Sequence, residues 1–301
     1  MAAAARIQGL DGIVVTEEGV TALDSRSSWA EGVVYLPGTH SIRWSDLLAD
    51  RILELDLTTG TGSVFATGVE FVNGRTLDLD GSVIQCSHGR RRVERVVDGR
   101  VEEVVAAWNG VRFNSPNDVV VASDGAIWFT DPPYGLVLPG EGHGGDREYG
   151  DHWVFRHDPA TGVSAPVVVD VEEPNGLAFS PDESLLYVAD SSRVTRGDAG
   201  NHHVRVYDVM DGRCKNGRVF ATVDVAVPDG LRVDAAGRVW ITAGDGVHVF
   251  GADGEPLGSV LLPEKTANLC FGGADNTEVF IAATTTIYRV KTLTTDAARR
   301  S

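Results

Sequence analysis

The stretch from Asn117 to Phe129, Asn-Asp-Val-Val-Val-Ala-Ser-Asp-Gly-Ala-Ile-Trp-Phe, shows the pattern on which the fold rests. An Asn opens a short apolar run, a turn follows eight positions later at Gly125, and a second apolar run begins. Turns of this kind between short apolar runs are typical of β-hairpins. The pattern recurs with openings at Asn73, Asn175, Asp229 and Asn268, and a more divergent sixth copy begins at Glu31. The chain therefore repeats one hairpin.

The spacing of these repeats indicates a β-propeller. Successive openings lie 42, 44, 58, 54 and 39 residues apart, which leaves room in each unit for further strands such as Arg51–Leu57 and Thr286–Val290. About four strands, repeated six times, predict an all-β fold, a six-bladed β-propeller with four-stranded blades around a central channel. The long repeat disfavours a β-solenoid, and six copies of one hairpin disfavour a two-sheet sandwich.

The whole chain, residues 1–301, is expected to form this single domain, because no linker or low-complexity segment divides it. Residues up to about position 28 precede the first repeat and are interpreted partly as an extension that helps to close the ring. Closure protects the last strand edge, and we predict a strand around Ile13–Thr16 in that role. The longest loops are expected at Pro132–Tyr149, which is rich in Gly, and at Ser191–His203.

The composition excludes several classes of protein. With 26 Lys and Arg against 43 Asp and Glu, the net charge is −17, which argues against a general nucleic-acid binder. No apolar run approaches the roughly 18 residues of a membrane span, and the N-terminus lacks the apolar core of a secretory signal. We therefore expect a soluble cytoplasmic protein without a membrane partner. The three cysteines lie far apart with no CxxC pair, so neither a disulfide scaffold nor a thiolate zinc site is predicted.

The repeat openings should meet at the channel, because the first strand of every propeller blade lines it. They are Glu31, Asn73, Asn117, Asn175, Asp229 and Asn268. This set contains two carboxylates and four carboxamides, which suit a hard cation such as Ca²⁺ better than Zn²⁺. The alternative is that these residues only start turns, a common use of Asn-Gly and Asp-Gly. The matched register of six positions favours a metal or polar-ligand site.

Several strings of the sequence resemble the gluconolactonase/regucalcin-like family, which also includes luciferin-regenerating-type proteins. They are Trp29-Ala-Glu-Gly, Arg112-Phe-Asn-Ser-Pro-Asn-Asp, Phe129-Thr-Asp-Pro-Pro-Tyr-Gly, Pro174-Asn-Gly-Leu-Ala-Phe-Ser-Pro-Asp and Pro228-Asp-Gly-Leu. The resemblance spans roughly Trp29 to Val290. It implies a six-bladed propeller, a divalent metal in the channel and hydrolysis of lactones. The implied metal is most commonly Ca²⁺, with Zn²⁺, Mn²⁺ and Mg²⁺ as alternatives.

The resemblance also implies site residues. The metal-binding Glu, Asn and Asp of the family fall on Glu31, Asn175 and Asp229. A further Asn, which contacts substrate in regucalcin-like proteins and metal in phosphotriesterase-like relatives, falls on Asn117. Two positions depart from the pattern. Ser115 stands where regucalcin has an Arg, and the family's acidic substrate contact maps close to Tyr134-Gly135, so the vertebrate substrate pocket does not transfer.

Other residues are candidates for the mouth of the channel. His88, Asp131 and Asp190 lie fourteen or fifteen positions after their repeat openings, which predicts one shared rim. His88 could bind substrate or relay a proton near neutral pH, or only support the neighbouring blade. Arg112 is a candidate cationic substrate contact, against the alternative of a surface residue or salt-bridge partner. Asn73, Asn117, His88, Arg112 and Asp131 form the predicted substrate-binding set.

We therefore expect a metal-dependent lactonase that hydrolyses a sugar lactone of the glucono-1,5-lactone type to the aldonic acid. The metal would polarise the lactone carbonyl, and Asp229 would act as base or position the attacking water. Two alternatives stay open. One is a phosphotriesterase-like or other ester hydrolase on the same metal site, and the other is a non-catalytic binding propeller.

Overall fold

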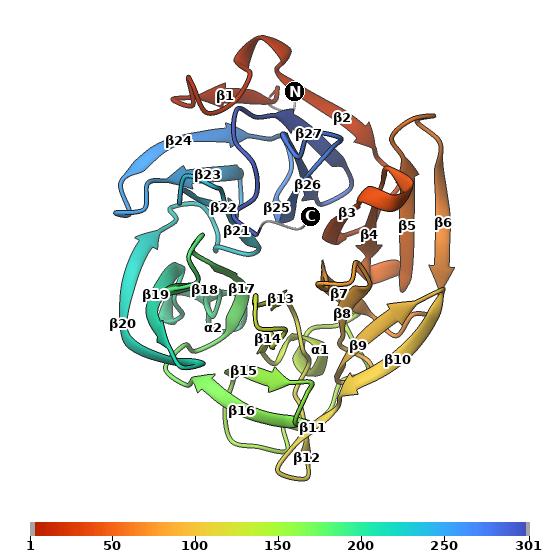
Figure 1. Cartoon of the computed structure of the whole chain (residues 1–301), viewed down its shortest axis with the longest axis vertical. Helices are drawn as coiled ribbons and strands as arrows, with labels where there is room; N and C mark the ends of the chain where they lie inside the picture. The colour runs from red at the N-terminus through yellow and green to blue at the C-terminus, as the bar shows by residue number, and fades with distance from the viewer. Residues whose placement is uncertain (1–3, 299–301) are drawn as a thin grey trace.

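The computed structural model describes residues 4–298, and within this range the strands form six antiparallel blades around a central channel (Figure 1). The first blade contains β3 (Ala30–Leu36), β4 (Ser41–Asp46), β5 (Arg51–Asp56) and β6 (Gly62–Thr67). The second contains β7 (Val72–Leu77), β8 (Val83–Ser87), β9 (Arg92–Val97) and β10 (Arg100–Val105). The third contains β13 (Val119–Val121), β14 (Ile127–Asp131), β15 (Trp153–Asp158) and β16 (Val163–Val168).

The remaining blades follow the same order from the channel outward. The fourth contains β17 (Pro174–Phe179), β18 (Leu185–Asp190), β19 (His203–Met210) and β20 (Arg213–Thr222). The fifth contains β21 (Leu231–Val233), β22 (Val239–Ala243), β23 (Gly246–Phe250) and β24 (Pro256–Leu261), with β1 (Arg6–Gln8) at its outer edge. The sixth contains β25 (Thr266–Gly272), β26 (Glu278–Ala283), β27 (Ile287–Lys291) and β2 (Val20–Asp24). The predicted six-bladed propeller is confirmed.

Short elements connect the blades. The hairpin β11 (Ala107–Trp108) and β12 (Val111–Arg112) lies between the second and third blades. The helices are α1 (Tyr134–Val137), α2 (Arg193–Arg196) and the 3₁₀ turns η1 (Thr16–Glu18), η2 (Pro37–Thr39), η3 (Leu47–Ala49) and η4 (Gly197–Ala199). Among the described residues, none of these helices has the length and apolar character needed to cross a membrane.

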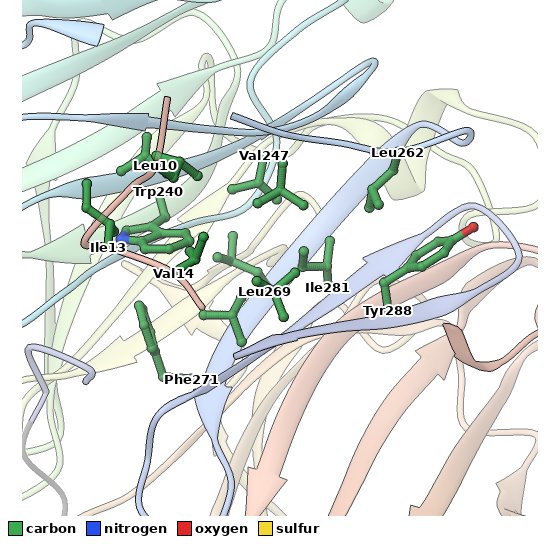
Figure 2. Packing of buried hydrophobic residues seen from close by; sticks show 14 of the residues in the cluster. Leu10, Ile13, Val14, Trp240, Val247, Leu262, Leu269, Phe271, Ile281 and Tyr288 are labelled. Atoms are coloured by element: carbon green, nitrogen blue, oxygen red, sulfur yellow. The ribbon is translucent and has the colours of Figure 1, made fainter. Parts of the chain in front are cut away.

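A strand near the N-terminus closes the ring, as expected, but it lies at a different position from the predicted strand. The closing strand is β2, which pairs antiparallel with β27, so the prediction of Ile13–Thr16 is wrong. Ile13 and Val14 instead pack in the core with Leu10 and Trp240 (Figure 2). The outermost strand of a blade is its most exposed one and does not need the most apolar residues. The sequence analysis placed the closing strand at the more apolar stretch, but Ile13 and Val14 of that stretch are buried in the core.

The core lies between neighbouring blades. Trp44, Trp128 and Trp240 come from β4, β14 and β22, the second strand of three different blades, and each is at most 2% exposed. Their positions repeat because alternate residues of a strand face the same side of its sheet. Packing of these large side chains between blades stabilises the ring that holds the channel residues together.

Candidate functional site at one end of the channel

The six repeat openings meet at one end of the channel, and all six side chains are buried. Each lies at, or just before, the beginning of an inner strand. Backbone hydrogen bonds link neighbouring blades at this level, from Gly74 N to Asn117 O (2.8 Å) and from Gly176 N to Asp229 O (3.0 Å). A Cβ atom on Gly176 would lie 2.4 Å from that Asp229 oxygen. Glycine after the opening residue therefore lets adjacent blades approach closely.

Irregularities of the inner strands direct the side chains at these positions. The pairing register shifts where β3 passes Glu31, where β7 passes Asn73, where β17 passes Asn175 and where β25 reaches Asn268. Such bulges leave residues unpaired and re-aim their side chains. In four of the six blades, such a bulge directs a polar side chain toward the channel.

Glu31 and Asp229 form a buried acidic pair. Burial and the negative charge of Asp229 raise the pKa of Glu31 well above its usual value. Burial also raises the pKa of Asp229 to about 6, against the lowering effect of Lys265 and of a hydrogen bond with the Asn175 side chain. Two carboxylates at this depth repel each other unless a proton or cation lies between them. The structure thus brings together Glu31, Asn175 and Asp229, as predicted.

Asn73 and Asn117 meet through His88, which lies just past β8. The His88 Nε2 atom is 3.3 Å from Asn73 Nδ2 and 3.4 Å from Asn117 Nδ2. Its Nδ1 atom is 2.9 Å from the backbone oxygen of Glu141. Burial lowers the pKa of His88 to about 4. The imidazole is therefore neutral near neutral pH, which disfavours the predicted proton relay.

Asn268 reaches the channel but its side chain is already engaged. Its Oδ1 accepts a hydrogen bond from Leu269 N (2.9 Å), and its amide contacts the Asp118 carboxylate. Asp118 in turn lies 3.6 Å from an Arg232 guanidinium nitrogen. Asn73 differs, because its Oδ1 is buried with no hydrogen-bond partner among residues 4–298. A buried oxygen without a hydrogen-bond partner is available to bind a cation or to accept a hydrogen bond from a hydroxyl group.

Three aspartates at the ends of second strands support the blades that carry Glu31, Asn117 and Asn175. Each accepts hydrogen bonds from the backbone N–H groups two and three residues before the channel residue, over distances of 2.7–3.4 Å. The pairs are Asp46 with Ser28 and Trp29, Asp131 with Asn114 and Ser115, and Asp190 with Glu172 and Glu173. Charge-assisted bonds of this kind hold the loop before each inner strand in place.

Two of the predicted substrate contacts are not brought to this group. The Asp131 carboxylate is fully buried and is occupied by Asn114, Ser115 and the Tyr149 hydroxyl. Arg112 is exposed on β12, a hairpin at the periphery of the ring (Figure 1), where its backbone N–H bonds to Glu148. The repeat spacing correctly predicted at which end of the molecule Asp131 lies. It did not indicate that the Asp131 carboxylate is engaged by the backbone before Asn117.

Sequence reasoning missed three charged groups near the acidic pair, one of which is Asp118, whose charge also raises the pKa of Glu31 and Asp229. Glu141 lies on the loop between β14 and β15, and burial together with the charge of Asp229 raises its pKa to about 7. Lys265 directly precedes β25, and its Nζ lies 5.0 Å from the centre of the Trp29 ring. The repeat pattern could not reveal Glu141, because the Gly-rich loop that carries it has no counterpart in the other repeats.

The donor set fits a hard cation. It combines the Glu31 and Asp229 carboxylates with carboxamide oxygens, including Asn73 Oδ1, which has no hydrogen-bond partner among residues 4–298. A divalent cation would offset the mutual repulsion of the two carboxylates. Among residues 4–298, no three His, Cys, Asp or Glu side chains are grouped as a metal site, so amide oxygens would have to complete the coordination.

Comparison with known proteins places this chain in a family. Residues 29–285 match the model of the SMP-30/Gluconolactonase/LRE-like region. The chain is 30% identical to a gluconolactonase of Zymomonas mobilis, over 95% of this chain and 84% of that protein. The structure resembles a gluconolactonase of Xanthomonas campestris, with a TM-score of 0.88, 33% identity and coverage of 96% and 95% of the two chains.

A more distant structural neighbour is regucalcin of Agrobacterium tumefaciens, described as a calcium-binding protein. The TM-score is 0.73 with 18% identity, over 97% of both chains; this similarity shows the shared fold. The match to the family model covers most of the chain, and every blade contributes to it. The chain therefore belongs to the SMP-30/gluconolactonase/LRE-like family.

Proposed function

We propose that the protein is a metal-dependent lactonase that hydrolyses a sugar lactone of the glucono-1,5-lactone type to the aldonic acid. The observation that carries the proposal is the buried Glu31–Asp229 pair at the polar end of the channel. It occurs in a chain that aligns over most of its length with gluconolactonases. An acidic pair inside a channel otherwise lined by amides suits a cation and an uncharged, hydroxyl-rich substrate.

Glu31, Asn175 and Asp229 would hold the metal, with Asn117 as a further ligand or a substrate contact. Ca²⁺ is the proposed ion, because the donors are all oxygen atoms and a structural neighbour is described as calcium-binding. When bound, the metal would polarise the lactone carbonyl and stabilise the negative charge that develops on its oxygen.

The chain's own groups would carry the proton. Asp229 accepts a proton from the attacking water as the water oxygen bonds to the carbonyl carbon. The ring C–O bond then breaks, and the proton passes to the departing ring oxygen, which becomes a hydroxyl group. Asn175 fixes the Asp229 carboxylate through its hydrogen bond. Asn73 Oδ1, which lacks a partner among the described residues, can accept a bond from a substrate hydroxyl.

The test is hydrolysis of glucono-1,5-lactone, followed by pH-stat, on protein stripped with a chelator and restored with Ca²⁺, Mg²⁺, Mn²⁺ or Zn²⁺. Activity that disappears on stripping and returns with one ion supports the proposal and identifies the metal. Activity that survives complete stripping would refute the metal dependence. Absence of lactone hydrolysis with every ion would refute the lactonase, and a parallel organophosphate assay would then distinguish the phosphotriesterase-like alternative from a binding propeller.

A further inference from the structure

We propose that His88 is a positioning residue that turns the carbonyl oxygens of Asn73 and Asn117 toward the channel. In this arrangement the imidazole carries its proton on Nδ1 and accepts hydrogen bonds from both amide groups at Nε2. The inference concerns the same site as the proposed function. It rests on that function only for the identity of the metal or substrate that the two oxygens bind. The hydrogen-bond arrangement itself is independent of any metal or substrate.

The loop between β14 and β15 sets the tautomer. The His88 Nδ1 atom lies 2.9 Å from the backbone oxygen of Glu141, and a carbonyl oxygen can only accept a hydrogen bond. Nδ1 must therefore carry the proton. The imidazole is 1% exposed and forms no salt bridge among residues 4–298, and an unpaired charge is costly to bury. The ring is therefore neutral, and Nε2 is left with a lone pair that can only accept.

The lone pair on His88 Nε2 then determines the orientation of the side-chain amides of Asn73 and Asn117. Asn73 and Asn117 each place a terminal side-chain atom 3.3–3.4 Å from Nε2. If either amide were reversed, its oxygen would face the Nε2 lone pair, and both groups would lose a hydrogen bond in a buried site. The N–H₂ groups therefore face His88, and the oxygens point away from it. This orientation leaves Asn73 Oδ1 buried without a hydrogen-bond partner among residues 4–298.

Close packing holds the loop against His88. A Cβ atom added to Gly135, in α1, would lie 2.7 Å from His88 Cβ and 2.8 Å from Ser115 Cβ. Contacts this short do not occur between real Cβ atoms, so only Gly fits there without movement. The loop that carries Glu141 thus rests directly on the imidazole. Displacement of this loop should release His88 and disturb the two amides together.

The first test is nitrogen-edited NMR of the His88 ring in the wild-type protein, without metal or lactone. The expected result is a protonated Nδ1 and an unprotonated Nε2 throughout the neutral range. A proton on Nε2, or a doubly protonated ring at neutral pH, would overturn the proposal. This measurement needs no substitution, so misfolding of a variant cannot obscure it. The Gly135→Ala variant should weaken the preference for Nδ1–H.

The second test compares variants by Ca²⁺ titration and lactone kinetics. His88→Leu, which removes the acceptor, should weaken Ca²⁺ binding or raise the KM for lactone about tenfold or more, the scale of losing a group that orients a ligand. His88→Gln keeps an oxygen acceptor and should restore most of the loss. His157→Leu, which removes a buried imidazole from β15, is the matched control and should change neither value.

The two proposals can fail separately. If the NMR result is as expected but the wild-type protein neither binds Ca²⁺ nor hydrolyses lactone, the proposed function is refuted and the hydrogen-bond arrangement stands. If the wild-type protein is an active lactonase but His88→Leu matches it in Ca²⁺ affinity and KM, the positioning role is refuted. Equal losses in His88→Gln and His88→Leu would also contradict it, because the acceptor would then have no effect.

Discussion

The two ends of the central channel are lined by the same six inner strands, yet they differ in chemistry. At one end lie the buried carboxylates and carboxamides of the repeat openings. At the other lies a cavity of about 680 Å³, whose inner wall includes the apolar residues Val33, Val120, Ala178, Val233 and Phe271, with charged and polar residues between them and at the mouth. Arg75 and Arg232 line this cavity on the side toward the polar end, with Asp118 close to Arg232.

Exact placement of side chains matters more at the polar end of the channel than at the apolar end. The polar end depends on single hydrogen bonds, such as those of the Asp190 carboxylate to the backbone before Asn175. The apolar end depends on many interchangeable packing contacts, as the cluster around Val233 shows. Substitutions at the polar end should therefore alter hydrolysis and metal binding, whereas those at the apolar end should alter stability alone.

The largest effect is expected for Asp229→Asn. Loss of a general base lowers turnover by about a hundred- to ten-thousandfold, and Asn retains the size of the side chain. The measurement is lactone hydrolysis by pH-stat at a Ca²⁺ concentration that saturates the variant. Circular dichroism serves as the control for folding. Turnover equal to wild type with metal bound would show that Asp229 has no catalytic role.

Glu31→Gln should act mainly on the metal. The substitution removes one of the two carboxylates that balance a dication, and ligand charge changes Ca²⁺ affinity over orders of magnitude, so we expect a loss of about tenfold or more. Isothermal titration calorimetry with Ca²⁺ measures it. Because the buried carboxylates repel each other, the metal-free variant should be no less stable than the wild type. An unchanged affinity would remove Glu31 from the ligand set.

Asp190→Asn should have a smaller effect at the same end. It weakens two charge-assisted hydrogen bonds to the loop before Asn175 and the bonds from Ser192 and Asn201, at a stability loss of about 2 kcal/mol. Misplacement of the ligand should also lower Ca²⁺ affinity about tenfold. Chemical denaturation and calorimetry give the two values. If stability falls while affinity stays at the wild-type value, the aspartate supports the fold and not the ligand.

Val233→Ala tests the apolar end. Val233 is 2% exposed and lines the cavity, so removal of two methyl groups should lower the free energy of unfolding by about 2 kcal/mol. The kcat, the KM and the Ca²⁺ affinity should stay at wild-type values. A change in any of these three values would show that the two ends of the channel are coupled.

Asp182→Asn should have the smallest effect, and one that depends on pH. Asp182 lies at the apolar mouth, where bonds from Ser180 and Ser184 lower its pKa from 3.8 to about 2. A lowered carboxyl pKa stabilises the fold above about pH 4 and loses this effect as the pH falls toward 2. The difference between variant and wild type should be at most about 0.5 kcal/mol for this exposed group. Thermal unfolding should show it at pH 6 and not near pH 2; a difference that persists there would exclude the titration as its cause.

Much of the fold could be predicted because the hairpin is repeated. Residues that occupy equivalent positions in six repeats must occupy equivalent positions around the ring, so convergence of Glu31, Asn175 and Asp229 follows from register alone. The exceptions lie outside the repeats. The strand Val20–Asp24 closes the ring from an unrepeated segment, and Glu141 approaches the site from an unrepeated loop.

The architecture and the residue types at the channel can be read from the sequence, because hairpin signals are local and their repetition predicts a ring. The use of those side chains depends on contacts that form only in the folded protein. Asn73 and Asn268 occupy equivalent positions, yet within the described part of the chain the Asn73 oxygen has no partner, whereas the Asn268 oxygen accepts a hydrogen bond. That distinction depends on His88 and Asp118, whose contacts come from chain segments that meet only after folding. Hydrogen-bond direction is set by such neighbours, and no repeat pattern encodes it.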